Sequence, residues 1–247
     1  MAATVKGISK YELRSMEIYY LPVKDRQLGI THSYISQLRI NDPNMGVLLD
    51  NTFMPVAERT VICEKITSWL INNLFSDINK FRNREVGAEW FSVYIPVRVL
   101  VKDDFLEELK NTANTMNINL KDLCLCFNNK ILYEDHTVIT NIFKQMKEMG
   151  IKTMIMDFGD DFCPITRISS IMPDYVLLSQ SVTDSLLSSK EEKKITAISL
   201  YNFLKSINVE AITSSIKDDE MAEILPESFN LCTGTYAGNY RKPRSVR

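Results

Sequence analysis

Several features that define other classes of protein are scarce or absent in this chain of 247 residues. No apolar run approaches the roughly 18 residues that a membrane-spanning helix needs, and residues 1–6 lack the apolar stretch of a secretion signal. The formal net charge is only −2 and no long basic run is present, which gives no electrostatic reason to expect nucleic-acid binding. We therefore expect a cytoplasmic chain without a membrane span.

Cysteine and histidine are also few. The five cysteines form no C-x-x-C pair, and their odd number argues against a disulfide framework, so they are interpreted as buried thiols. Cys124 and Cys126 share a strand face, but with only His32 and His136 in the chain, nothing in the spacing supplies a tetrahedral zinc set. The short basic stretch at residues 241–244 is expected to be a solvated terminus.

The chain does contain a regular alternation of helical and strand-like segments, which predicts a mostly parallel sheet. Residues 17–23 and 30–40 read as an opening β-hairpin around a turn at 24–29. Later strands are expected at 90–101, 123–127, 153–158, 175–178, 209–212 and near 230, and helices over 60–75, from 103, over 138–146 with a stop at Gly150, up to about 207, and from 218. About eight such units indicate an α/β (β/α)₈ barrel, whose chemistry sits at the C-terminal ends of the strands.

Three segments follow one another in a fixed order along the chain. Residues 51–60 contain F-x-P-x-A-E, residues 147–159 run through M-G into M-D-F-G, and residues 172–178 read M-P-D-Y-V-L-L. They are similar to three motifs of the EAL-domain family, the cyclic di-GMP phosphodiesterases of bacterial signalling, in which the last two read D-D-F-G and P-x-D-Y-x-K-I. The similarity extends over about residues 17–243. It implies a TIM-like barrel of the EAL type with a two-metal active site at its mouth.

Most of the metal ligands that this resemblance implies are replaced. The glutamate of E-A-L corresponds to Ile35, the strand-end asparagine to Tyr94 and the glutamate of L-E-I-T-E to Cys124. In D-D-F-G the first aspartate is Met156, and only the second survives, as Asp157. The family's lysine, the two glutamates of A-E-G-V-E and a late glutamine correspond to Leu177, Ser214, Lys217 and Thr233. Two-metal hydrolysis needs several oxygen ligands, so we expect no bound metal, no cofactor and no catalytic residues.

Two residues keep the identity that the resemblance associates with ligand binding. Arg39 matches the arginine after E-A-L, which contacts the dinucleotide in the family, and a guanidinium suits bidentate recognition of phosphate. Its alternative role is that of a strand-end arginine paired with a nearby carboxylate. Asp157 is the one conventional hard ligand, although an aspartate before F-G also suits hydrogen bonding to the turn backbone.

The sequence therefore predicts a catalytically inactive EAL-type module of cyclic di-GMP-related signalling that acts through contacts with a protein partner. The alternative is a degenerate receptor that binds cyclic di-GMP or another nucleotide without hydrolysing it. We expect a connector at residues 1–16, a degenerate EAL domain at 17–247, and pairing into a homodimer, as the resemblance implies. Whether the chain is a piece of a larger signalling protein stays open.

Overall fold

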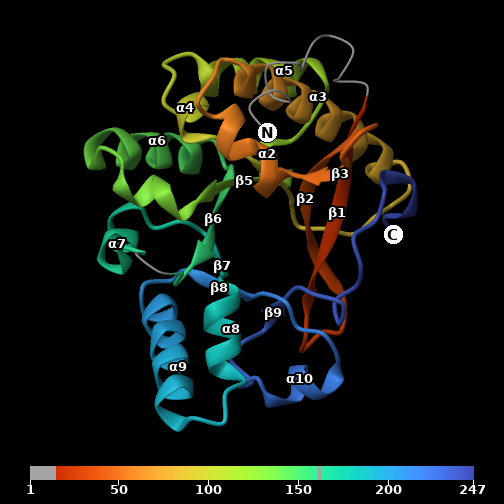
Figure 1. The fold of residues 1–247 in the computed structure, drawn as a ribbon. Helices are drawn as coiled ribbons and strands as arrows, with labels where there is room; N and C mark the ends of the chain where they lie inside the picture. Colours follow the sequence, from red (N-terminus) through yellow and green to blue (C-terminus); the bar gives the residue numbers. More distant parts are fainter. Residues whose placement is uncertain (1–14, 161–162) are drawn as a thin grey trace.

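The computed structural model describes residues 15–160 and 163–247, and within these residues nine strands form one sheet (Figure 1). The expected connector over residues 1–16 lies outside the described residues, apart from Ser15 and Met16. The strands are β1 Met16–Asp25, β2 Thr31–Asp42, β3 Gly46–Leu49, β4 Phe91–Tyr94, β5 Leu123–Asn128, β6 Lys152–Phe158, β7 Tyr175–Leu178, β8 Glu210–Thr213 and β9 Leu231–Cys232.

The sheet closes into a barrel. Its strand order is β1-β9-β8-β7-β6-β5-β4-β2-β3, and an additional pairing of β1 with β2 joins the two sides. Strands β4 to β8 are parallel to their neighbours, β1 is antiparallel to both β2 and β9, and β3 is a short ninth strand on the edge of β2. The expected α/β (β/α)₈ TIM-like barrel with an opening hairpin is confirmed.

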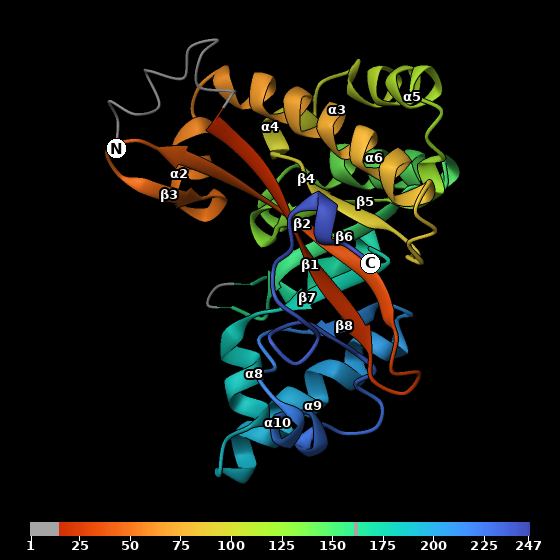
Figure 2. The same cartoon turned by 90° about the vertical axis from the view of Figure 1, so that its right-hand side faces the viewer.

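Helices cover the outside of the barrel. Figures 1 and 2 place α3 to α6 on one side and α8 to α10 on the opposite side. The helices are α2 Asp50–Ala57, α3 Ile62–Arg82, α4 Val97–Leu100, α5 Phe105–Thr115, α6 His136–Glu148, α7 Ile168–Ile171, α8 Gln180–Leu186, α9 Glu191–Ser206 and α10 Asp219–Ile224, with 3₁₀ turns η2 Leu120–Asp122, η3 Asn129–Tyr133, η4 Ile165–Arg167 and η5 Pro243–Ser245. No helix in the described part of the chain is long and apolar enough to cross a membrane.

Local sequence explains where several elements stop. Gly150 ends α6 as predicted: its φ of 77° suits the left-handed turn after a helix, and its N–H bonds the carbonyl of Lys147. The expected strand over 90–101 is too long, because it ends at Tyr94. Pro96 lacks an N–H for a sheet ladder and instead precedes α4. The expected single helix up to 207 is two helices, α8 and α9.

Apolar side chains form two layers. One lies between the sheet and the helices, and a smaller one fills the barrel interior with Val23, Ile35, Trp90, Cys124, Cys126, Met154, Tyr175, Ile212 and Leu231. All five cysteines are free thiols, and four of them are buried, Cys163 being half-buried. The filled interior makes the lumen a core and leaves the mouth for any site.

The basic tail is not a solvated terminus. Residues 240–247, which we call the C-terminal strap, lie along the outside of the opening hairpin. The backbone of Arg241 exchanges two hydrogen bonds with Tyr20, at 2.8 and 2.9 Å. Val246 is 1% exposed, and the Tyr34 hydroxyl donates to the carbonyl oxygen of Arg247. Burial of this one apolar side chain and pairing with β1 hold the strap in place.

Candidate functional site: the mouth of the barrel

The C-terminal ends of β4, β5 and β6 surround a cavity of about 220 Å³, closed on one side by α2. Its lining combines carboxylates, small polar groups and apolar side chains: Ser36, Asp50, Asn51, Met54, Pro55, Glu58, Ser92, Tyr94, Val97, Cys126, Asn128, Lys130, Met156 and Asp157. Three of the positions predicted to face the mouth, Tyr94, Met156 and Asp157, are among them. The cavity lies where a parallel barrel places its chemistry.

Tyr94 crosses the cavity wall from β4 to α2. Its hydroxyl donates a hydrogen bond of 2.6 Å to Oε1 of Glu58, and both side chains are half-buried. Burial raises the pKa of Tyr94 well above its ordinary value, and the Glu58 carboxylate raises it further, so the phenol stays protonated as a donor. Glu58 lies inside the F-x-P-x-A-E segment, but sequence reasoning gave it no role at the site.

Asp157 stands at the end of β6 in a left-handed backbone conformation, with φ of 53°. Its carboxylate accepts a long hydrogen bond of 3.5 Å from the Asn128 side chain, and its carbonyl accepts one of 3.0 Å from the Asn129 side chain. Partial desolvation raises the pKa of Asp157, and the nearby Asp160 carboxylate raises it further. Among residues 15–160 and 163–247, the side chain lies beside polar groups and forms no ion pair with a cation.

Asp50 adds a third carboxylate, which sequence reasoning missed. It begins α2, and burial raises its pKa despite hydrogen bonds from backbone N–H groups, including that of Asn51. Of the lining residues that the structure describes, Lys130 is the one with a cationic side chain. The mouth is therefore acidic, which does not suit an anionic ligand unless cations accompany it.

Arg39 does not line the cavity. Its guanidinium carbon lies 3.9 Å from the ring centroid of Tyr19 and 4.9 Å from that of Tyr240, and its Nε donates to the side-chain oxygen of Gln37 at 2.9 Å. The Gln37 amide in turn donates to the Tyr240 hydroxyl at 3.3 Å. Arg39 thus packs on two aromatic rings, and no carboxylate of the described residues lies within ion-pair distance of it. The cavity does not bring it together with Asp157.

The position of the missing L-E-I-T-E glutamate needs a correction. In the β4–β5 register Tyr94 pairs with Cys126 and Ser92 pairs with Cys124. Cys126 lines the cavity, whereas Cys124 lies one layer deeper in the barrel interior. The strand residue that faces the mouth beside Tyr94 is therefore Cys126. A shift of two residues along a strand keeps the same face, so sequence pattern alone does not distinguish the two.

The donor set at the mouth does not fit a two-metal centre. Ile35 is buried in the apolar interior, and Ser214 lies against Thr183 of α8 rather than in the cavity. Lys217 is exposed and does not line the cavity. Across residues 15–160 and 163–247, no three His, Cys, Asp or Glu side chains come together as a group that could hold a metal ion.

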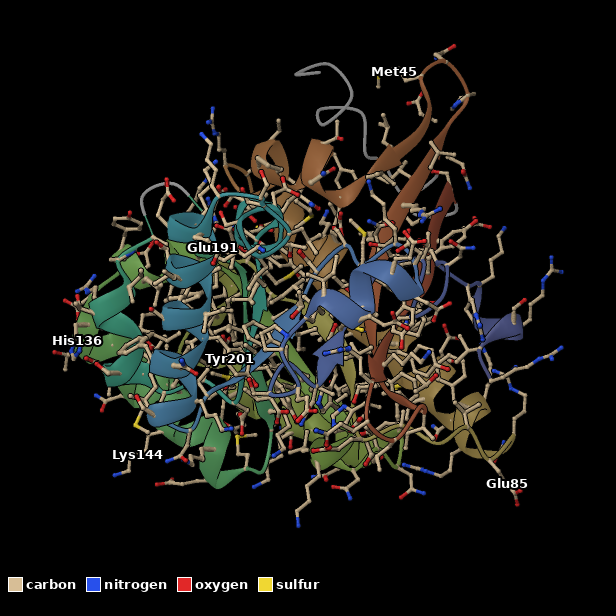
Figure 3. The ribbon with its side chains drawn as sticks, turned by 90° about the horizontal axis from the view of Figure 1, so that it is seen from below. Met45, Glu85, His136, Lys144, Glu191 and Tyr201 are labelled. Carbon is tan, nitrogen blue, oxygen red and sulfur yellow. The ribbon has the colours of Figure 1, made fainter. Side chains whose placement is uncertain are left out.

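The two histidines lie outside the cavity at the mouth. His32 forms an ion pair of 2.8 Å with Glu89 and packs against Trp90 and Tyr175. His136 begins α6 and is exposed at the edge of the molecule (Figure 3). Neither residue contributes to the cavity.

Known protein families and structures resemble this chain. The sequence profile of the EAL domain matches residues 8–239. The cyclic di-GMP phosphodiesterase PA2567 of Pseudomonas aeruginosa is 24% identical over 187 residues, covering 72% of this chain and 30% of that protein. Among solved structures, the PaMucR phosphodiesterase in complex with c-di-GMP superposes with a TM-score of 0.86 at 15% identity over 96% of both chains. The FimX EAL domain of Pseudomonas aeruginosa bound to c-di-GMP gives 0.84 at 14% identity, over 100% of this chain and 98% of that one.

The oxygen sensor protein DosP of Escherichia coli is 21% identical over 91% of this chain but only 28% of its own length. The chain thus spans about a third or less of the length of these curated relatives. The structural likenesses, at such low identity, establish the fold.

Proposed function

Because this chain belongs to the EAL-domain family, we propose that it is a non-hydrolytic module of bacterial cyclic di-GMP-related signalling that acts by contacting another protein. The observation that carries the proposal is the Tyr94–Glu58 bond at the mouth. A neutral phenol stands at the position where the resemblance implies a metal-bound asparagine, and it uses an oxygen of the nearby Glu58 carboxylate. Met156 and Cys126 complete this wall of the cavity without an oxygen ligand.

The scaffold is kept while the hydrolytic chemistry is not supported. The buried apolar core and the closed strand order stabilise the barrel, and the barrel gives a partner a defined surface to recognise. In this proposal the module works in the bacterial cytoplasm, and it pairs into a homodimer as the family resemblance implies. Its effect on signalling passes through protein contacts rather than through turnover of a nucleotide.

A nucleotide receptor is the second candidate, and Arg39 is the observation that favours it. This guanidinium keeps two terminal nitrogens for which the described residues offer no carboxylate within ion-pair distance. Against the receptor stand the acidic mouth and the two tyrosines that already cover Arg39. An anionic dinucleotide would have to displace Tyr240 and approach three carboxylates.

Two measurements on the purified chain separate the alternatives. Incubation with cyclic di-GMP and Mg²⁺ or Mn²⁺ should give no hydrolysis above a blank without protein, and hydrolysis that Asp157→Ala abolishes would overturn the proposal. Calorimetric titration with cyclic di-GMP should give no saturable heat. Tight saturable heat that Arg39→Gln removes would instead establish the receptor.

A further inference from the structure

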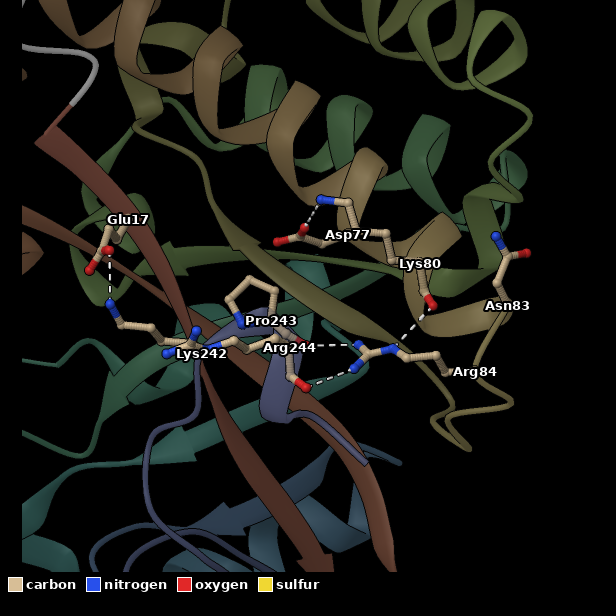
Figure 4. Close-up of a pocket in the computed structure, with 8 residues that line it drawn as sticks. All are labelled: Glu17, Asp77, Lys80, Asn83, Arg84, Lys242, Pro243 and Arg244. Atoms are coloured by element: carbon tan, nitrogen blue, oxygen red, sulfur yellow. Dashed lines mark hydrogen bonds and ion pairs between the residues drawn. The ribbon is translucent and has the colours of Figure 1, made fainter.

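A second and larger cavity lies outside the barrel, between the C-terminal half of α3 and the C-terminal strap (Figure 4). It is an open groove with a volume of about 710 Å³. Of the described residues that line it, four carry cationic side chains and two carry carboxylates, which leaves two positive charges in excess. The lining residues are Glu17, Asp77, Lys80, Asn83, Arg84, Lys242, Pro243 and Arg244. We call this feature the α3–strap groove.

Both carboxylates of the groove are already engaged within the protein. The Asp77 side chain is 8% exposed, and it accepts hydrogen bonds from the Tyr20 hydroxyl at 3.0 Å and from Lys80 Nζ at 2.8 Å. Glu17 is paired with Lys242 Nζ at 2.9 Å. Neither carboxylate is therefore directed at the two arginines.

Arg84 and Arg244 keep an uncompensated positive charge. Arg84 donates to the carbonyl oxygens of Pro243 at 2.7 Å and Arg244 at 3.0 Å, and from Nε to the carbonyl of Lys80. These acceptors are neutral. The Arg244 side chain is exposed, and among the described residues neither arginine forms an ion pair with a carboxylate. Figure 4 shows the two residues on different segments, Arg84 in the turn that follows α3 and Arg244 on the strap.

We propose that the α3–strap groove docks an acidic segment of a partner protein, with carboxylates of that segment reaching Arg84 and Arg244. The inference rests on the proposed function and names the chemistry of the partner. A guanidinium suits the recognition of carboxylates. The hydrogen bonds from Arg84 to the strap carbonyls hold its charge beside the backbone of Arg244, so the two arginines can present neighbouring cations to one acidic chain. The mouth cavity carries the opposite charge, so it would repel the same segment and leave the groove as its docking surface.

The charges of the groove are open to solvent, which sets the expected strength of binding. Lys80 and Lys242 are 62% and 41% exposed, and exposed ion pairs contribute little individually. Complementary charge at such a surface acts mainly on the association rate and is screened by salt. Docking should therefore be weak to moderate in affinity and steeply dependent on ionic strength.

The test uses the full chain and a fluorescein-labelled oligoglutamate peptide, with an oligoglutamine peptide of equal length as the neutral probe. Fluorescence anisotropy at low ionic strength should show saturable binding of oligoglutamate only, and added NaCl should weaken it. Arg244→Gln should weaken binding about three- to fivefold, as expected for loss of one exposed charge pair. Lys144→Gln on α6, an exposed lysine on another part of the surface (Figure 3), should leave binding unchanged.

Three outcomes would overturn the assignment. The first is that binding of the oligoglutamate peptide does not saturate, and the second is that Lys144→Gln weakens this binding as much as Arg244→Gln does. The third is that a single-stranded DNA of equal length efficiently displaces the labelled peptide, which would point to a phosphate ligand. Arg84→Lys, which keeps the charge but loses the fork that holds the Pro243 and Arg244 carbonyls, should also weaken binding. These binding results do not depend on hydrolysis of cyclic di-GMP. The hydrolysis assay tests the proposed non-hydrolytic function, and the peptide assay tests the groove, so failure of one proposal can be told from failure of the other.

Discussion

The Tyr94 hydroxyl lies 2.6 Å from the Glu58 carboxylate and joins the end of β4 to the end of α2 across the mouth of the barrel. This short bond joins two elements that are separated along the chain by the long helix α3 and the segments on either side of it. The contact makes the mouth a packed structural junction as well as a cavity.

Removal of the Tyr94 hydroxyl should be measurable as a loss of stability. Tyr94→Phe leaves the ring but removes a hydrogen bond to a charged group, which should lower the free energy of unfolding by about 1–2 kcal/mol. Urea denaturation provides the measurement. Tyr133→Phe, at a 57% exposed tyrosine, is the matched control and should change it by less than about 0.5 kcal/mol. Equal effects of the two substitutions would contradict a role for the Tyr94–Glu58 bond.

Gly234 should not tolerate a side chain. Its φ is 122°, and a Cβ atom there would lie 2.1 Å from the carbonyl oxygen of Ile216. Gly234→Ala therefore forces backbone of the β8–α10 loop to move, and we expect a loss of more than about 2 kcal/mol or failure to fold. Gly87→Ala, with no atom within 4 Å of the added Cβ, is the control and should be close to neutral. Thermal denaturation followed by circular dichroism compares the two.

The stack of Arg39 on Tyr19 should carry a coupling energy. In a double-mutant cycle of Arg39→Gln and Tyr19→Leu, we expect about 0.5–1 kcal/mol of coupling, typical of a cation–π contact at an exposed site. The same cycle between Arg39→Gln and Tyr133→Phe should give a coupling close to zero. Additivity of the first pair, measured by urea denaturation, would show that the observed 3.9 Å stack does not stabilise the fold.

Glu210 should make stability depend on pH. Partial desolvation raises the pKa of Glu210, a residue at the exposed start of β8; His32 partly opposes the shift, and the nearby Glu89 and Asp25 carboxylates add to it. A raised pKa in the folded state means that the contribution to stability is fully present below the unfolded value near 4.5 and is lost as the pH rises through the folded value. Glu210→Gln should therefore raise the melting temperature at pH 7 relative to the wild type.

The gain from Glu210→Gln should shrink as the pH falls to about 4, where the wild-type carboxyl also becomes neutral. Glu227→Gln, at an exposed loop residue, should show no such trend. A constant difference between Glu210→Gln and the wild type across this range would exclude the carboxyl as the titrating group.

The parts of the fold that sequence predicted are those that local pattern determines. The strand at Tyr175–Leu178 and the end of α6 at Gly150 follow from β-branched and aromatic runs and from a glycine stop. Strand β3 and helix α4 were not predicted. β3 is a four-residue strand that pairs with the end of β2 in a local hairpin across residues 43–45, and so short a run carries little strand pattern of its own.

The candidate site was predictable to the level of strand ends. The motif order placed Tyr94, Met156 and Asp157 at the mouth, and all three line the cavity. The hydrogen bond between Tyr94 and Glu58 could not be predicted from the sequence, because it depends on how α2 packs over β4. The choice between Cys124 and Cys126 failed because both side chains point to the same face of one strand. The ligand roles of Arg39 and Asp157 stay predictions.

The pairing of β1 with β9 and with the strap also affects the order in which the barrel can fold. β1 closes the barrel against β9, and Tyr20 pairs with Arg241, so these contacts join segments more than two hundred residues apart. During synthesis, we therefore expect one edge of β1 in the opening hairpin to stay unpaired until β9 has been made. An early, half-closed sheet of this kind exposes a template for association with other chains. We therefore expect a chain that lacks β9 and the strap to be more prone to aggregation than one that contains them.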